Sequence, residues 1–424
     1  MFRRDAIEDY VEVDETAHQL LRSPEAPIML LPRRMPKAHP PLAEAVAPDN
    51  AWIGAFLPYT PLHELLLERF PALVATSANF SDEPLLSREA ELGPMLAHVA
   101  DFALTHDREI EHKCDDSVVR PFGAGSILIR RARGWVPRPV PLARVDPDAE
   151  GTLAVGGELK STFALLRDGA AVLSQHLGDL EDLSSRENWD KELADFCALH
   201  QFTPERAVCD LHPDYYATRR AEAMGLPLLH VQHHYAHLAS VLADNGETGP
   251  AIGIIFDGTG YGTDGTLWGG EFLYGDLFHW ERRGWLRPMP LPGGEQAIRE
   301  PWRLAWALLS ELEGPAIEAE RDILAARVEE KRVETVARML ERSLNCPLAS
   351  GVGRLLDGWG ALLELGDVAT HEAQLPVALE SLAGAQAGAR SITHESLLKA
   401  KLGTHYAYSI DARTPGALIL ESAP

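Results

Sequence analysis

Two histidines and an aspartate stand where a divalent metal ion could be bound. His233 and His237 follow a short apolar run and open a further apolar segment, so we expect a strand that ends where a helix begins. Residues four apart on a helix share one face, which places the two imidazoles side by side. Asp257 follows another apolar run, 251–256, and offers a hard oxygen ligand. Two imidazoles and this carboxylate could together hold a metal.

A glycine turn follows the aspartate and consists of Gly258, Thr259 and Gly260. Glycines let backbone N–H groups approach a phosphate, so we expect a nucleotide here, at the carboxyl end of a strand in an open α/β sheet. Each motif has a plainer alternative, a polar helix start for the histidine pair and an ordinary turn for the glycines. Their closeness in sequence, each behind an apolar strand, favours a joint site for metal and nucleotide.

The composition is that of a globular, acidic protein. The chain has 424 residues, enough for two or three domains, and 46% of them are hydrophobic. A net charge of −24 argues against binding to nucleic acid or to an anionic membrane, which both favour a basic face. No apolar run approaches the length of a membrane span. Four cysteines without a CxxC pair fit a reducing compartment, so we expect a cytoplasmic protein.

The first third of the chain offers candidate nucleotide-binding side chains in one loop. An expected apolar strand at 73–75 runs into the short hydroxyl and amide side chains of Thr76, Ser77 and Asn79. Such side chains could contact phosphate or ribose oxygens with short donors. An ordinary capped turn explains the same residues equally well.

Arginines end the last expected strand of this region. Arg130 and Arg133 could clamp a phosphate or a carboxylate, although solvated edge charges are the plainer interpretation. The following stretch, 134–151, is rich in proline and lacks hydrophobic periodicity. It therefore indicates a linker and a domain boundary.

The second half has the element order of an α/β domain. From residue 153 the apolar runs predict strand, strand, strand, helix, strand, helix, strand, helix and strand. This order is the outline of an RNase-H-like, actin-like fold. Residues 300–365 are expected to be mostly helical.

Nine motifs, in this order, resemble the HypF carbamoyltransferases of nickel–iron hydrogenase maturation. They are TSANFSDEP (76–84), CDDSVVR (114–120), RRARGWVPRP (130–139), AVGGELKSTF (154–163), SQHLGDLED (174–182), CDLHPDYYATR (209–219), VQHHYAH (231–237), FDGTGYGTDGTLWGGEF (256–272) and LPGGEQAIREPWR (291–303). The resemblance extends over nearly the whole chain, up to about residue 385. Motifs of this number and length are far more specific than the histidine pair alone.

The resemblance implies an α/β protein with two functional parts. Residues 1–145 would be part of a YrdC-like domain, 146–152 a linker, and 153–424 part of a TsaD-like, actin-like domain. The first domain would use ATP to convert carbamoyl phosphate to carbamoyl-adenylate. The second would pass the carbamoyl group to the C-terminal cysteine thiolate of a HypE-type partner, where dehydration yields a cyanide ligand.

The family's site residues can be carried over where its motifs match. The metal ligands, for magnesium or iron, match His233, His237 and Asp257. The nucleotide region of the YrdC-like part contains Thr76, Ser77, Asn79, Arg130 and Arg133. The nucleotide loop of the second part matches Gly258, Thr259 and Gly260. Because the partner's thiolate attacks, no catalytic nucleophile is expected in this chain.

The chain also departs from the family pattern. The acylphosphatase-like domain, the CxxC zinc fingers and the start of the YrdC-like domain have no counterpart, nor do a glycine-rich segment and a further metal-binding aspartate near the other end. We therefore expect an internal piece of a HypF-type protein, or one piece of a split gene. One alternative is a small-molecule O-carbamoyltransferase, a class that resembles this chain in its two domain types but has them in the reverse order along the sequence. Another alternative is an inactive piece that only binds nucleotide or a partner. The charge of −24 disfavours an enzyme acting on tRNA.

Overall fold

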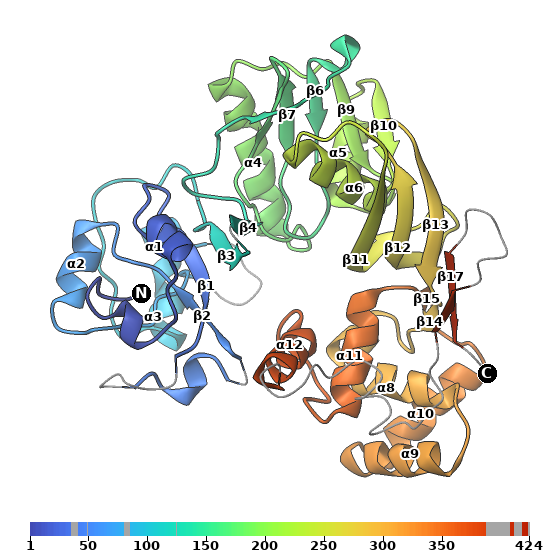
Figure 1. Ribbon diagram of the computed structural model, residues 1–424. Helices are drawn as coiled ribbons and strands as arrows, with labels where there is room; N and C mark the ends of the chain where they lie inside the picture. The colour runs from blue at the N-terminus through green and yellow to red at the C-terminus, as the bar shows by residue number, and fades with distance from the viewer. Residues whose placement is uncertain are drawn as a thin grey trace. The chain divides into compact units, whose positions relative to one another are not determined.

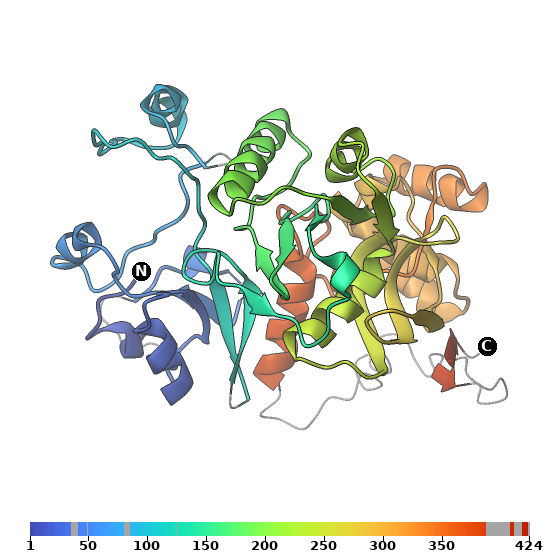
Figure 2. The same cartoon turned by 90° about the horizontal axis from the view of Figure 1, so that it is seen from above.

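The computed structural model of the chain describes residues 1–34, 41–48, 50–79, 85–123, 125–386, 408–410 and 418–422. These residues form a mixed α/β structure with three sheets, drawn from two directions in Figures 1 and 2. The chain divides into two compact units, Met1–His230 and Val231–Pro424. The α/β class expected from the sequence is confirmed.

The α-helices of the described residues are α1 (Glu15–Leu21), α2 (Pro61–Leu67), α3 (Leu92–His98), α4 (Leu183–Leu199), α5 (Tyr216–Ala223), α6 (His233–Asp244), α7 (Glu295–Arg299), α8 (Trp302–Ser310), α9 (Pro315–Arg327), α10 (Glu330–Glu341), α11 (Val352–Leu362) and α12 (Gln374–Gln386). The strands are β1 (Ile28–Pro32), β2 (Trp52–Ala55), β3 (Val118–Phe122), β4 (Gly125–Arg130), β5 (Val140–Pro141), β6 (Thr152–Ala154), β7 (Ala164–Arg167), β8 (Ala170–Leu173), β9 (Arg206–Asp210), β10 (Leu228–Val231), β11 (Ala251–Tyr261), β12 (Leu267–Gly275), β13 (Trp280–Leu286), β14 (Met289–Pro290), β15 (Leu348–Ala349), β16 (Tyr408–Ile410) and β17 (Leu418–Ser422). The expected helical stretch 300–365 is confirmed by α8 to α11.

A four-stranded sheet begins the first unit, in the order β2-β1-β3-β4. β1 pairs antiparallel with β2 and parallel with β3. Alternate strand residues, including Met29, Leu31 and Val119, point to a core that also contains Ala17 and Leu21 of α1. Burial of every second residue is what a sheet with one covered face requires.

The strand expected at 73–75 is wrong. Leu73 donates its N–H to the carbonyl of Met1, but no strand forms at these residues. Val74 is 76% exposed, so its apolar side chain has no core to enter. A short apolar run becomes a strand only when a neighbouring strand and a covering layer are present.

The second sheet of the first unit has the order β10-β9-β6-β7-β8-β5. β6 pairs in parallel with β9 and antiparallel with β7, which pairs antiparallel with β8. Trp189 and Phe196 of α4 pack with buried residues of these strands. If β6 to β10 are numbered 1 to 5, their order in the sheet is 5-4-1-2-3, and β5 follows at the edge beside β8. The order of strands and helices predicted from residue 153 is confirmed, and this pairing is that of an RNase-H-like sheet.

The stretch expected to be a linker is folded against this sheet in part. β5 pairs antiparallel with β8, the 3₁₀ helix Pro147–Ala149 follows, and Thr152 already belongs to β6. The boundary between the two compact units lies at 230/231, away from 146–152. The division into 1–145, 146–152 and 153–424 therefore stays a prediction.

A hairpin of long strands forms the sheet of the second unit. β12 pairs antiparallel with β11 and with β13, and the sheet continues through β15 and β14 on one side and β17 and β16 on the other. The helices α8, α9, α10 and α11 share a core that includes Trp302, Leu324 and Val336. Within the described residues, no helix combines the length and hydrophobicity needed to cross a membrane.

β11 differs from its sequence prediction at the aspartate. We expected the strand to end at Asp257 in a glycine turn, but β11 continues to Tyr261 with a register shift between Phe256 and Gly260. Three residues of β11, 257–259, here oppose the single residue Gly269 of β12, which is a bulge of two extra residues. The bulge turns Asp257 out of the regular ladder, while pairing with β12 resumes at Gly260.

Candidate functional site

The start of α6 places both histidines at one spot. Gln232 caps the helix, because its side-chain Oε1 accepts a hydrogen bond of 2.9 Å from the N–H of Tyr235. His233 and His237 follow one helical turn apart, and their Nε2 atoms are 3.3 Å from each other. The shared helix face predicted from the sequence is confirmed.

Asp257 completes the cluster from the bulge in β11. Its Oδ2 lies 3.2 Å from Nε2 of His233 and 3.8 Å from Nε2 of His237. Its Oδ1 accepts the N–H of Gly258 at 2.6 Å, which orients the carboxylate. The three side chains therefore converge in space, although 19 residues lie between His237 and Asp257 in the sequence.

The donor atoms of this cluster fit a divalent cation. The buried Oδ2 of Asp257 has no hydrogen-bond partner within the described residues. One atom from each of His233, His237 and Asp257 lies within 4.8 Å of the others. Atoms about 3.4 Å apart are expected around an ion that they bind at about 2.1 Å in tetrahedral geometry. Burial favours the neutral acid, but the two imidazoles outweigh it and lower the pKa of Asp257, so the carboxylate is charged.

His234 lies beside the cluster and is fully buried. Its Nδ1 is 3.1 Å from the side-chain nitrogen of Gln232, whose oxygen already accepts from Tyr235. The Gln232 amide therefore donates to Nδ1, and the ring proton of neutral His234 is on Nε2, 3.7 Å from Oδ2 of Asp257. Burial lowers the pKa of His234 to about 4, which keeps it neutral. His234 Nε2 is too far from Asp257 for a hydrogen bond, and neither ring nitrogen has a lone pair free for a metal.

Gly260 permits this close packing of α6 on β11. A Cβ at this position would lie 2.5 Å from Cε1 of His234 and 2.8 Å from Cδ2 of His233. Only glycine leaves room for both imidazoles. In the predicted nucleotide loop, Gly260 is buried, Gly258 is partly buried and Thr259 is exposed.

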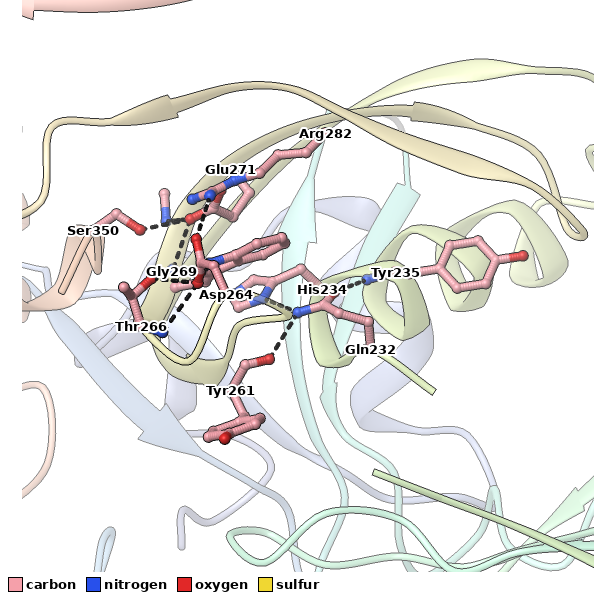
Figure 3. A network of polar contacts seen from close by, with 12 residues as sticks. Gln232, His234, Tyr235, Tyr261, Asp264, Thr266, Gly269, Glu271, Arg282 and Ser350 are labelled. Carbon is pink, nitrogen blue, oxygen red and sulfur yellow. Dashed lines mark hydrogen bonds and ion pairs between the residues drawn. The ribbon is translucent and has the colours of Figure 1, made fainter. Parts of the chain in front are cut away.

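A buried carboxylate holds the strands around the site together (Figure 3). Glu271 of β12 is fully buried and accepts from Arg282 Nε at 2.7 Å and from Ser350 Oγ at 2.6 Å. Arg282 also reaches Asp264 at 3.2 Å, and Asp264 accepts from Trp268 Nε1 in the β11–β12 turn. The sequence did not single out Glu271, because a lone glutamate in a strand carries no recognisable spacing.

The segment after β15 is a second glycine loop at the site, which the sequence-based prediction missed. A Cβ on Gly351 would lie 2.2 Å from the carbonyl oxygen of Gly258, and one on Gly353 would lie 3.2 Å from Gly258 Cα. The backbone before α11 therefore packs directly on the loop that follows Asp257. A short strand, two glycines and a helix in succession are the signal that could have identified it.

The residues predicted in the first unit are brought together only in part. Asn79 and Arg130 line one cavity of about 560 Å³, together with Lys160, Thr162 and His176. Arg130 donates from Nε to the carbonyl of Asp116 at 2.9 Å. Its Nη1 also lies 3.9 Å from Oδ1 of Asp115.

Arg133, in contrast, makes hydrogen bonds and a ring contact with other residues of the first unit. Its guanidinium donates to Asp116 Oδ1 at 2.8 Å and to the carbonyls of Glu25 and Ala26 at 3.2 and 2.9 Å. It also lies 3.9 Å from the ring centre of Tyr59. These contacts give Arg133 a structural role in this conformation.

Thr76 and Ser77 are exposed and lie outside any helix or strand. Ser77 Oγ donates to Asn79 Oδ1 at 2.6 Å, an arrangement typical of a polar turn. The remainder of the motif, 80–84, lies outside the described residues. Nucleotide binding by Thr76, Ser77, Asn79, Arg130 and Arg133 stays a prediction.

Another group with metal-binding spacing lies in the first unit and consists of Glu111, His112 and Asp195. Lys191 Nζ lies 3.6 Å from Glu111 and 3.2 Å from Asp195. The ammonium thus already offsets part of the negative charge of the two carboxylates. This group fits a cation less well than the cluster around Asp257.

Three family models match successive parts of the chain. Residues 2–132 match the Sua5/YciO/YrdC family, described as telomere recombination. Residues 147–244 match the HypF Kae1-like domain, and residues 253–414 match the second subdomain of a Kae1-like carbamoyltransferase domain.

Relatives of known name are similar over most of this chain. Carbamoyltransferase HypF of Rhizobium leguminosarum bv. viciae is 38% identical over 388 residues, which are 89% of this chain and 49% of the relative. Carbamoyltransferase HypF of Rhodobacter capsulatus is 40% identical over 90% of this chain and 51% of its own length. The chain thus spans about half the length of the curated relatives it matches.

Solved structures show the same similarity. A full-length HypF in its phosphate- and nucleotide-bound form matches with a TM-score of 0.85 and 32% identity over 99% of this chain and 52% of that one. HypF of T. kodakarensis matches with a TM-score of 0.81 over 90% of this chain and 50% of that one. Fold, motifs and sequence similarity agree, and the chain belongs to the HypF carbamoyltransferase family.

Proposed function

We propose that this chain carries the carbamoyl-activating and carbamoyl-transferring parts of a HypF-type carbamoyltransferase. The observation that carries the proposal is the cluster of His233, His237 and Asp257 beside two glycine loops. The names of the relatives support carbamoyl transfer, and the phosphate- and nucleotide-bound HypF supports the use of a nucleotide. The substrates would be carbamoyl phosphate and ATP, with carbamoyl-adenylate as intermediate.

A divalent metal, magnesium or iron, would be held by Nε2 of His233 and His237 and by Oδ2 of Asp257. When bound, it would polarise phosphoryl or carbamoyl oxygens and stabilise the charge that develops on them. Gly258 orients the carboxylate through its N–H, and buried His234 lies beside the same carboxylate, with its Nε2 3.7 Å from Oδ2. Residues that orient metal ligands raise affinity for the metal and select its position.

The attacking group would come from outside the chain. Burial raises the pKa of the thiol of Cys209 to about 11, and burial also raises the pKa of the thiols of Cys114, Cys197 and Cys346. Thiols with raised pKa are poor nucleophiles at neutral pH. This property agrees with an acceptor thiolate at the C-terminus of a HypE-type partner.

Formation of carbamoyl-adenylate belongs, in this proposal, to the Sua5/YrdC-like part at 1–145, and transfer to the Kae1-like part at 153–424. The cavity lined by Asn79, Arg130 and Lys160 offers amide and cationic groups suited to a phosphate. Because the chain spans about half of its relatives, activity of this chain by itself is part of what must be tested.

The first test is metal content and binding of a non-hydrolysable ATP analogue to the purified chain. A His233→Ala, His237→Ala double variant should lose both metal and metal-dependent nucleotide binding. The matched control is His230→Ala, His279→Ala, which removes two histidines outside the cluster. A parent chain that binds neither ligand, or a double variant that binds both as the parent does, would contradict the proposed function.

The second test is transfer to a thiol. The chain is incubated with carbamoyl phosphate, ATP, magnesium and a HypE-type protein ending in cysteine, and the mass of the acceptor is measured. We expect a mass increase of one carbamoyl group that requires Asp257 and the acceptor's terminal cysteine. Binding of metal and nucleotide without transfer would restrict the proposal to the binding steps.

A further inference from the structure

Arg354 is a buried arginine with too few partners. It lies in the first turn of α11 and is 9% exposed. Its Nη2 is 3.1 Å from Oδ2 of Asp357, and its buried Nε has no hydrogen-bond partner within the described residues. A guanidinium has five N–H donors, so one carboxylate contact leaves most of them without an acceptor. A buried charge in this condition is unfavourable unless a further anion is present.

Asp357 gives this arginine one carboxylate contact, at 3.1 Å. Burial raises the pKa of Asp357 to about 6, against the opposing effect of Arg354. This single contact leaves most of the guanidinium N–H groups at the start of α11 without an acceptor within the described residues.

The backbone around Arg354 adds further donors. α11 spans Val352–Leu362 and begins after Gly351, which provides no side-chain cap. No backbone acceptor for the N–H groups of 352–354 occurs within the described residues. Free N–H groups and the helix dipole make such a terminus attractive to an anion. Ser350, immediately before it, is fixed by its hydrogen bond to buried Glu271 (Figure 3).

This start of α11 lies next to the metal cluster. Nη2 of Arg354 is 3.6 Å from where a Cβ on Gly258 would be, and Gly351 and Gly353 pack on the same glycine. Gly258 is the residue that follows Asp257. Val352 and Gly353 are partly exposed and Thr259 is exposed, so a solute can reach this place.

We propose that Arg354 and the first turn of α11 form a binding site for a phosphoryl group of the nucleotide, adjacent to His233, His237 and Asp257. The planar guanidinium can pair with two phosphoryl oxygens, and the helix N–H groups can donate to the same group. This inference rests on the proposed function, because it assigns further residues to the same nucleotide site.

The test is binding of inorganic phosphate and of a non-hydrolysable ATP analogue, measured by calorimetry with magnesium present. Arg354→Gln should weaken analogue binding at least about tenfold, because it removes charge-assisted hydrogen bonds. Arg354→Lys keeps the charge and should lose less. Arg327→Gln is the matched control, since Arg327 is another helical arginine paired with an aspartate, at 3.4 Å from Asp367. It should bind the analogue as the parent does.

Asp357→Asn is expected to raise the affinity for phosphate, whereas Arg354→Gln is expected to lower affinity for the ATP analogue. It removes the competing carboxylate, so phosphate should bind at least about threefold more tightly and should raise the unfolding temperature more than in the parent. If Arg354 served only its ion pair with Asp357, this variant would lose stability without gaining phosphate affinity, which overturns the proposal. This measurement also decides the matter if Arg354→Gln does not fold.

The outcomes separate the two proposals. A parent chain that binds neither metal nor analogue contradicts the proposed function. A parent that binds both, beside a folded Arg354→Gln that binds the analogue with parental affinity, overturns only the assignment of Arg354.

Discussion

The cluster of His233, His237 and Asp257 in the second unit and Arg133 in the first unit were both predicted from the sequence to contact a ligand. They differ in how completely their polar groups are paired within the protein. Arg133 has two backbone carbonyls, the Asp116 carboxylate and the ring of Tyr59 around it. Asp257 has an oxygen without a hydrogen-bond partner within the described residues, facing two imidazole nitrogens. A charged group whose hydrogen-bonding atoms are all paired within the protein stabilises the fold. A charged group with an unpaired donor or acceptor atom can bind a ligand.

The largest effect is expected at the unsatisfied cluster. Asp257→Asn should lower metal affinity at least about 100-fold, because a neutral amide replaces the charged ligand. Metal titration followed by calorimetry measures this. Asp244→Asn, at the exposed end of α6, is the control and should bind metal as the parent does. Equal affinity in Asp257→Asn would remove this residue from the site.

Substitution of Arg133 should lower the stability of the fold and should not change ligand binding directly. Arg133→Ala should lower the free energy of unfolding by about 2–4 kcal/mol, because three hydrogen bonds and a cation–π contact are lost. Arg138→Ala, whose exposed side chain pairs with Glu25, should cost at most about 1 kcal/mol. Urea unfolding compares the two. An unchanged stability with lost nucleotide binding would instead support the role predicted from the sequence.

His234 should make the metal-free chain sensitive to acid. Its pKa is lowered from 6.5 to about 4 in the folded chain, so the unfolded chain binds its proton first as the pH falls. The stability from this group is complete above pH 6.5 and is lost as the pH falls toward about 4, by at most about 3 kcal/mol.

Urea unfolding with a chelator, repeated between pH 7 and 4, measures this loss. His234→Gln should show a smaller loss over the same range, and His279→Gln, which is highly exposed, should keep the parental loss. Parallel pH profiles for the parent and His234→Gln would show that another group is responsible.

The smallest effect is expected at Ser77. Its side chain is exposed and bonded only within its own turn, so Ser77→Ala should change the free energy of unfolding by less than about 0.5 kcal/mol. If the predicted nucleotide contact exists, affinity for the ATP analogue should fall about fivefold, the value of one hydrogen bond. Unchanged affinity would place Ser77 outside the nucleotide site.

Several features of the site follow from local sequence. The spacing of His233 and His237 on one helix face, the cap at Gln232 and the order of strands and helices from residue 153 depend on neighbours in the chain. Such features obey helix and strand periodicity, so they could be predicted without tertiary structure. The motifs that resemble the HypF family were also a property of sequence alone.

Other features depend on residues far apart in sequence. The sequence suggested that Asp257 joins the histidines, but only the bulge in β11 and the bare backbone at Gly260 bring the carboxylate to them. Likewise nothing in the sequence indicated that Arg133 contacts the carbonyls of Glu25 and Ala26. The run 73–75 looked like a strand, although only Leu73 of it is hydrogen-bonded to the neighbouring segment at Met1 and no strand forms.

The sequence by itself determined which residues carry chemistry, how the local elements follow one another and to which family the chain belongs. Only the tertiary structure decided which of those residues have complete partners and which do not. It also brought Glu271, Ser350 and Arg354 to the loop after Asp257. The physical reason is that donors and acceptors are satisfied through space, by groups whose separation along the chain carries no periodic signal.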